Sequence, residues 1–389
     1  MPQRSPPTVG DALAPLRALA PERLAEAWDK VGLALGDEAW PAPRAMLCID
    51  LTQAVLREAI AARVGLLVCY HPPLFHPLDR LVAGEPRGAL LLEAARRTIA
   101  LYSPHTALDA AVAGLNDWLA DALGAGRCSP IVPSPEPDAQ LRKVVSFVPT
   151  PQAQAVRRAM SDAGAGHIGN YQECSYNLPG FGTFRPLDGA RPAIGVVGEL
   201  ETVDEVRIEM VCPAAAVPDV VRAMRSAHPY EEPAFDILPL LPDPSPPDRG
   251  QPRPGQGRFV ELRRPASLGA LVRRIKRWLA LPRVELALPE AWGPLAQATR
   301  RPVRRIALCA GAGHSVLVKA SDAELLITGE MRHHDVLALR ARGQAVLLAG
   351  HTQTERPFLP ELAERLAAGS GGRVAWSVAS SDRAPSVPA

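Results

Sequence analysis

A histidine and a glutamate four residues apart follow a short apolar run near the end of the chain. The run 345–349 is typical of a buried strand, and Gly350 after it permits a sharp turn. In that turn the side chains of His351 and Glu355 lie on one side and converge on a single point. The pattern indicates either a pair of metal ligands or an exposed ion pair between positions i and i+4.

Two earlier segments of the chain end in the same way. Residues 65–70 form an apolar run that stops at a histidine, and residues 98–102 form another that leads to a histidine and an aspartate. Ligands gather at the carboxyl ends of the strands in open α/β sheets. We therefore expect five side chains at one edge: His71, His105, Asp109, His351 and Glu355. Imidazole and carboxylate without thiolate suit zinc, iron, manganese or cobalt, and five donors predict two neighbouring ions that share a carboxylate.

These residues belong to a series of motifs that carries a family resemblance. The chain resembles the Nif-three-like family of dinuclear metal-binding proteins, also known as the GTP cyclohydrolase 1 type 2-like family. The matching motifs are 28–33 (WDKVGL), 70–75 (YHPPLF), 105–109 (HTALD), 114–117 (GLND), 166–171 (GHIGNY), 228–232 (HPYEE), 328–335 (TGEMRHHD) and 351–356 (HTQTER). The resemblance implies metal ligands at His71, Asp109, His351 and Glu355, with His105 lining the same pocket.

One position departs from the commoner bacterial form of the family, which has two consecutive histidines before the proline. Here the first of the two is Tyr70. A phenolate is a costly ligand, because the unperturbed pKa of a phenol is about 10. We therefore predict one or two divalent ions per subunit, with Tyr70 as a candidate ligand of the second. The Tyr-His-Pro-Pro form is more similar to the eukaryotic branch of the family.

Two classes of function remain open. In the first, the protein is a metal-dependent hydrolase that activates water toward a nucleotide or phosphoester substrate, with Glu330 or His105 as the catalytic proton carrier. The GTP cyclohydrolase name implies a purine as the target, although no residue pattern in the sequence indicates recognition of guanine. In the second, the protein is a non-catalytic metal-binding regulator or scaffold that binds protein partners, as the resemblance to eukaryotic members implies.

The order of apolar runs and amphipathic segments predicts an α/β protein with mostly parallel sheets. Two Pro-rich stretches, 130–138 and 242–257, divide the chain, and we expect the second to be mobile. The pattern between them approximates a β-α-β-β-α-β unit, an α+β ferredoxin-like arrangement. Because the expected ligands lie on both sides of this unit in the sequence, we interpret it as an insertion into one metal-binding domain. The resemblance implies that the insert is PII- or CutA-like.

These observations predict four segments. Residues 1–140 form the first part of the Nif-three-like metal-binding domain, 143–240 form the insert, 256–379 form the second part of that domain, and 380–389 form a disordered tail. The resemblance adds a homohexamer, toroidal in shape, whose openings the insert gates.

Composition narrows the class of protein. The net charge of +2 argues against a dedicated nucleic-acid binder. The six cysteines show no Cys-x-x-Cys spacing and imply no disulfide framework. There is no signal-peptide pattern and no apolar run of about 18 residues, so we expect no membrane association and a cytoplasmic protein.

Overall fold

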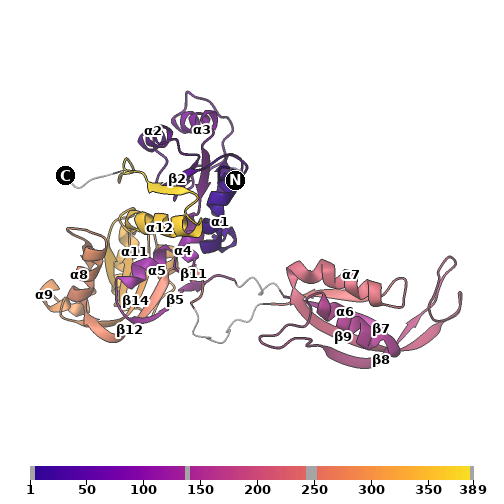
Figure 1. Ribbon diagram of the computed structural model, residues 1–389. Helices are drawn as coiled ribbons and strands as arrows, with labels where there is room; N and C mark the ends of the chain where they lie inside the picture. Colours follow the sequence, from indigo (N-terminus) through magenta and orange to yellow (C-terminus); the bar gives the residue numbers. More distant parts are fainter. Residues whose placement is uncertain (1–4, 136–140, 242–251, 386–389) are drawn as a thin grey trace. The chain divides into compact units, whose positions relative to one another are not determined.

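The computed structural model of the protein describes residues 5–135, 141–241 and 252–385 (Figure 1). The chain forms two compact units. One unit combines Met1–Ser134 with Gly250–Ala389, and we call it the core unit; the other is Pro135–Arg249, and we call it the inserted unit.

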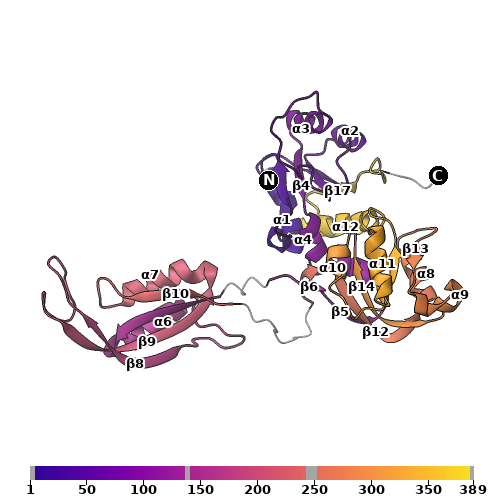
Figure 2. The same ribbon diagram turned by 180° about the vertical axis from the view of Figure 1, so that it is seen from behind.

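The first sheet of the core unit holds strands from both ends of the chain (Figures 1 and 2). Its order is β1 (Gly32–Leu35), β4 (Ala100–Ser103), β3 (Leu66–Cys69), β2 (Arg44–Cys48) and β17 (Ala375–Val378). The β1–β4 pairing is antiparallel and the other three pairings are parallel, which confirms the expectation of mostly parallel strands for this sheet. The residues of β3 and β4 are all buried, because helices cover both faces of the sheet.

The second sheet of the core unit is mixed. Its order is β13 (Glu285–Ala287), β16 (Ala345–Leu348), β15 (Leu325–Thr328), β14 (Pro302–Cys309), β12 (Arg258–Ser267) and β5 (Gly126–Ser129). Only β14, β15 and β16 run parallel, and the remaining pairings are antiparallel. The expectation of mostly parallel sheets is therefore wrong for this sheet, because antiparallel strands extend the parallel trio on both sides.

Helices pack on both faces of the two core-unit sheets. They are α1 (Val9–Leu19), α2 (Gln53–Ala61), α3 (Pro86–Arg96), α4 (His105–Ala110), α5 (Leu115–Asp121), α8 (Leu268–Trp278), α9 (Leu295–Ala298), α10 (His314–Leu317), α11 (His333–Ala341) and α12 (Leu359–Gly369). Helices α2 and α3 cover one face of the first sheet, whereas α1 and α12 contribute to the larger apolar cluster on its other face. In the second sheet, α5 and α8 pack on one face, and α10 and α11 on the other.

The inserted unit is a four-stranded antiparallel sheet with two helices. Its elements are β7 (Leu141–Pro149), α6 (Ala153–Asp162), β8 (Tyr176–Phe184), β9 (Glu201–Pro213), α7 (Val217–Ala227) and β10 (Phe235–Pro239), in the sheet order β10-β7-β9-β8. This is the β-α-β-β-α-β connectivity typical of ferredoxin-like units. Both helices bury their apolar sides on the same sheet face. The finer likeness to PII and CutA proteins stays a prediction.

A short two-stranded ribbon lies where the chain leaves the core unit and returns to it. Strand β6 (Val132–Pro133) pairs antiparallel with β11 (Gly255–Gln256), and the Ser134 amide donates to the Pro254 carbonyl at 3.0 Å. Residues 242–251 of the expected mobile linker lie outside the described residues. The C-terminal end of this linker is ordered, however, because the pairing of β11 with β6 satisfies backbone groups of the Pro- and Gly-rich segment.

The expectation of a disordered tail from residue 380 is wrong for residues 380–385. Asp382 is only 6% exposed, and its carboxylate accepts from the Ile49 amide and from the Arg356 guanidinium. These buried polar contacts tie the segment after β17 to the core unit. Residues 386–389 lie outside the described residues.

Among the described helices, none is both long and apolar enough to cross a membrane. The location of the protein in the cell stays a prediction.

Candidate metal centre

The residues of the candidate site follow the carboxyl ends of parallel strands in both core-unit sheets. His71 comes two residues after β3, and Asp50 two residues after β2. In the other sheet, Glu330 comes two residues after β15, and His351 three residues after β16. The strand ends thus supply the side chains, as the sequence predicts.

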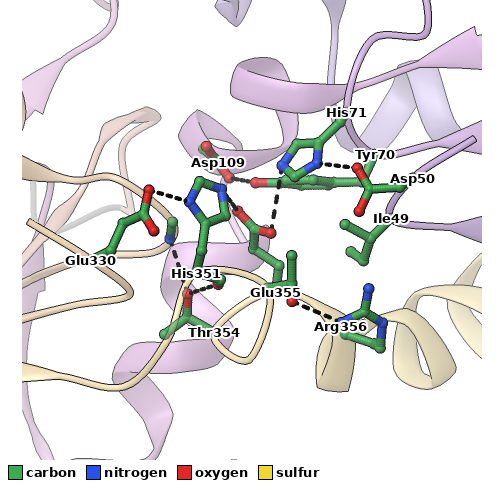
Figure 3. Close-up of polar contacts among 12 residues, drawn as sticks. Ile49, Asp50, Tyr70, His71, Asp109, Glu330, His351, Thr354, Glu355 and Arg356 are labelled. Atoms are coloured by element: carbon green, nitrogen blue, oxygen red, sulfur yellow. Dashed lines mark hydrogen bonds and ion pairs between the residues drawn. The ribbon is translucent and has the colours of Figure 1, made fainter. Parts of the chain in front are cut away.

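Three side chains converge at the centre of this region (Figure 3). His71 Nε2 lies 3.5 Å from Glu355 Oε2, and His351 Nε2 lies 3.3 Å from Glu355 Oε1. One ligand atom from each of the three residues lies within 4.8 Å of the others. Glu355 is 3% exposed, and its Oε2 accepts no hydrogen bond from any described residue. A buried carboxylate whose two oxygens each face an imidazole nitrogen, and one of which has no hydrogen-bond donor, is a fitting place for a cation.

A second carboxylate holds each imidazole from its other side. The Asp50 carboxylate lies 2.9 Å from His71 Nδ1, and the Glu330 carboxylate lies 3.0 Å from His351 Nδ1 (Figure 3). Histidines that bind metals almost always use one ring nitrogen in this way, which fixes the tautomer and turns the other nitrogen to the ion. The donor set and its supports therefore fit a divalent ion such as zinc, iron, manganese or cobalt.

The charges of the group lead to the same conclusion. Burial acts to lower the pKa of His71, but the Asp50 and Glu355 carboxylates outweigh it and raise the pKa to about 10. The Glu355 carboxylate likewise raises the pKa of His351 to about 9. Burial acts to raise the pKa of Glu355, yet the two imidazoles hold it below the usual value. At neutral pH the two imidazoles therefore each carry an extra proton, and these two positive charges balance the carboxylates. One divalent ion carries the same charge and can replace the two protons.

Glycines bring the backbone close to this group. Gly350 adopts φ +91°, which opens the turn that carries His351. Gly311 adopts φ +62°, and a Cβ atom there would lie 2.7 Å from Glu355 Oε1. The Thr354 hydroxyl accepts from the Gly311 amide at 2.9 Å and donates to the His351 carbonyl at 2.6 Å. The loop after β14 and the turn after β16 therefore fix each other, and a side chain at Gly311 would displace the glutamate.

The other two predicted metal ligands, Tyr70 and Asp109, contact each other. The Tyr70 hydroxyl donates a short hydrogen bond to Asp109 Oδ1 (Figure 3). Burial raises the pKa of Asp109 to about 6 and places that of the Tyr70 phenol well above its usual range. Both residues line the same cavity as Glu355 but lie outside the three-residue group. The phenol is thus placed as a hydrogen-bond donor to the Asp109 carboxylate.

His105 lies between these two sets of residues. Its Nδ1 is 2.8 Å from the Asp29 carboxylate, and its ring packs edge to face against the rings of Tyr70 and His71, with both pairs of centroids 5.6 Å apart. Asp29 also accepts from the Thr106 amide and hydroxyl. Although burial acts to raise the pKa of Asp29, the hydrogen bonds and charge of His105, with further bonds from Thr106, lower it to about 2. His105 is therefore held by a carboxylate, as His71 and His351 are.

Sequence reasoning missed the carboxylates that support the histidines. Asp50 follows the strand Arg44–Cys48, and this position at a strand end is the signal that singled out His71 and His351. Asp29 lies in the first motif of the family resemblance, but no spacing rule connects it to His105, 76 residues later. The sequence predicts Glu330 as a candidate proton carrier, but no pattern in it indicates the contact between Glu330 and His351.

Comparisons with known proteins match nearly the whole chain. The profile of the Duf34/NIF3 (NGG1p interacting factor 3) family matches residues 7–385. A "GTP cyclohydrolase 1 type 2 homolog" of Mycobacterium tuberculosis is 39% identical over 92% of this chain and 91% of that protein. A "NIF3-like protein 1" of Bos taurus is 31% identical over 96% and 90% of the two chains. The structure of a Bacillus cereus protein related to NIF3 aligns with a TM-score of 0.73 at 29% identity, covering 99% of this chain and 100% of that one.

Proposed function

Because this chain belongs to the Duf34/NIF3 family, we propose that it is a metal-dependent hydrolase acting on a nucleotide or phosphoester substrate. One observation carries the proposal: two imidazoles converge on the buried carboxylate of Glu355, and each is held from behind by a second carboxylate. Such supported donor sets are typical of protein metal sites. The names of the relatives suggest a purine nucleotide, whereas the site itself supports the wider class of nucleotides and phosphoesters.

Within this proposal, His71, His351 and Glu355 hold the first divalent ion. Asp109, in the same cavity, is the donor for a second ion, with Tyr70 and His105 beside it. A divalent ion bound there supplies a Lewis acid that stabilises negative charge developing on the substrate. Whether one or two ions bind per subunit depends on whether Asp109 exchanges its hydrogen bond from Tyr70 for a metal ion.

The side chains around the ligands have separable roles in the proposed reaction. Asp50 and Glu330 orient the two ligand imidazoles, since each contacts an Nδ1 atom. His105 is the better placed of the two predicted proton carriers, because Asp29 engages its Nδ1 and the ring lines the cavity. A histidine held in this way can take or give a proton at Nε2. Glu330 is thereby proposed as an orienting carboxylate.

The proposal is tested by metal analysis followed by a hydrolysis screen. The protein as purified should contain divalent metal, and Glu355→Gln should lose most of it because a neutral amide no longer balances the ion's charge. Glu364→Gln is the matched control, since Glu364 is an exposed residue of α12 without a role in the site. The metal-loaded protein should hydrolyse a nucleotide or phosphoester, and a chelator should abolish that activity. Equal metal content in the two variants would refute the assignment of the site.

A second function is supported by the surface of the inserted unit. Thirteen of the twenty large hydrophobic side chains that are exposed in the described residues lie between Ile168 and Leu241. Exposed apolar surface of this extent is typical of contact surfaces. It supports the alternative of a metal-binding regulator or scaffold that binds protein partners, and also a homohexamer formed by this chain. Light scattering would give six times 41.5 kDa for the hexamer. A metal-loaded protein without hydrolytic activity on any tested nucleotide or phosphoester would favour the regulator.

A further inference from the structure

A cavity of about 460 Å³ opens beside the candidate metal centre. It lies within the core unit, and its volume falls in the range of about 300–1,000 Å³ that is usual for small-molecule sites. His351 and Glu355 form part of its wall, so a ligand in the cavity reaches the metal-binding group. The proposed function gives no role to three other lining residues, Trp28, Phe75 and Lys319.

Trp28 and Phe75 give the cavity an aromatic wall. Their ring centroids lie 6.1 Å apart with an interplanar angle of 60°. Trp28 also meets the His105 ring edge to face, with centroids 6.1 Å apart. Trp28 nevertheless stays 55% exposed, although burial of an indole is strongly favourable. Its contacts with two neighbouring rings hold the exposed face in place, so a planar ring can stack on it with little additional loss of side-chain entropy.

Lys319 adds a positive charge to the same cavity. It is one of only four lysines in the chain, and the other basic residues are arginines. Lys143, by comparison, pairs with Glu209 at 2.7 Å. The Lys319 ammonium has no ion pair or hydrogen bond with any residue in the described ranges 5–135, 141–241 and 252–385. A cation that lacks an acidic partner and lines a cavity attracts anions, and phosphate is the anion that protein lysines commonly bind.

We infer that the cavity binds a nucleoside monophosphate, with the base stacked on Trp28 and Phe75 and the phosphate held by Lys319. This inference rests on the proposed function and narrows its substrate class. A phosphoester without an aromatic ring leaves Trp28 uncovered, and a nucleoside without phosphate leaves Lys319 unpaired. Because every base has a π-face, the site selects ligands that carry a ring over ligands that lack one, with little preference among bases.

Three probes separate the two contacts: adenosine 5′-monophosphate, ribose 5-phosphate and adenosine. Their binding is measured by calorimetric titration of the full-length protein, both as purified and after removal of metal with a chelator. Adenosine 5′-monophosphate should bind about ten- to a hundredfold more tightly than ribose 5-phosphate, which is the usual effect of one stacked base. Guanosine 5′-monophosphate should bind within a few-fold of the adenosine compound.

Two substitutions should each affect only the ligands that carry the matching group. Trp28→Leu should weaken adenosine 5′-monophosphate about tenfold or more and leave ribose 5-phosphate unchanged, which also shows that the variant is folded. Lys319→Gln should weaken both phosphates and leave adenosine unchanged. Lys276→Gln is the matched control, because it removes the same charge from α8 outside the cavity. It should leave the binding of all three ligands unchanged.

Several results would overturn the inference. They are equal binding of adenosine 5′-monophosphate and ribose 5-phosphate, equal losses for both ligands in Trp28→Leu, and equal effects of Lys319→Gln and Lys276→Gln. Binding as expected in a protein that holds no metal and hydrolyses nothing would defeat the proposed function and leave this binding site intact. Metal-dependent hydrolysis of substrates with and without a ring at equal rates would support the proposed function and defeat the nucleoside monophosphate site.

Discussion

The carboxylate of Asp382 connects the end of the chain to both sides of the candidate metal centre. Its Oδ2 accepts from the Ile49 amide at 2.9 Å and from Arg356 Nε at 3.1 Å, and its Oδ1 accepts from Arg356 Nη2 at 3.2 Å. Ile49 directly precedes Asp50, which orients His71. Arg356 directly follows the candidate ligand Glu355. We therefore predict that Asp382→Ala both destabilises the core unit and weakens metal binding.

The expected loss of stability follows from the groups that the substitution leaves unpaired. Removing one partner of a buried charge pair costs about 3–5 kcal/mol. The Arg356 side chain is 22% exposed and keeps its 2.9 Å hydrogen bond to the Thr352 hydroxyl, which favours the lower end of that range. The unpaired Ile49 amide adds about 1–3 kcal/mol when water cannot reach it. We expect a total of about 4 kcal/mol, and about tenfold weaker metal binding because the ligand supports shift.

Urea unfolding of the metal-free protein measures the first effect, and competition with a chelator measures the second. Ser381→Ala is the control, because it changes the neighbouring residue and removes a part-buried hydrogen bond to Glu58 without removing any contact of Asp382. We expect this control to cost about 1.5 kcal/mol, well below the cost of Asp382→Ala, and to leave metal affinity unchanged. If Asp382→Ala unfolds within about 1 kcal/mol of the parent, the segment after β17 is not an integral part of the fold. Unchanged metal affinity would show that Ile49 and Arg356 do not transmit its effect to the ligands.

Three further predictions concern the ions and the inserted unit. Metal binding should release about two protons near pH 7, because His71 and His351 have pKa values of about 10 and 9 without metal and an ion needs both neutral. Affinity should therefore rise with pH up to about 9–10, and equal calorimetric heats in buffers of different ionisation enthalpy would contradict this. Tyr70→His should raise the metal stoichiometry if the tyrosine weakens the second position, whereas equal and tight binding of two ions by both proteins would show that it does not. Joining Ser134 directly to Pro254, whose backbones already meet at 3.0 Å, should leave a folded core unit that binds metal; a soluble but metal-free variant would place ligands in the deleted part.

Much of the candidate site could be predicted from the sequence because its geometry is local. A buried strand fixes where the backbone ends, and the residues directly after it must lie at that edge of the sheet. This is why His71 and His351 are found where the sequence places them. The same holds for the pair His351 and Glu355, whose convergence depends only on the turn that Gly350 permits.

The connectivity of the inserted unit could also be predicted, since each of its elements follows its own periodicity. The make-up of the two core-unit sheets could not. Strand β17 joins the first sheet next to β2, and β5 joins the second next to β12. Both pairings connect segments that are distant in the sequence, and no local pattern indicates which open strand edge a short strand will join.

The sequence by itself determined the kinds of donor at the site, the strand ends that carry them and the family to which the chain belongs. These depend on residue type, local periodicity and ordered motifs. The tertiary structure alone decided which carboxylate stands behind each histidine, that Tyr70 donates to Asp109, and that Asp382 is buried against Arg356. Such contacts join residues up to 333 positions apart, as between Asp382 and Ile49. Their partners are set by how the two sheets pack, because a polar group that loses water on folding must bond to whatever group the packing places beside it.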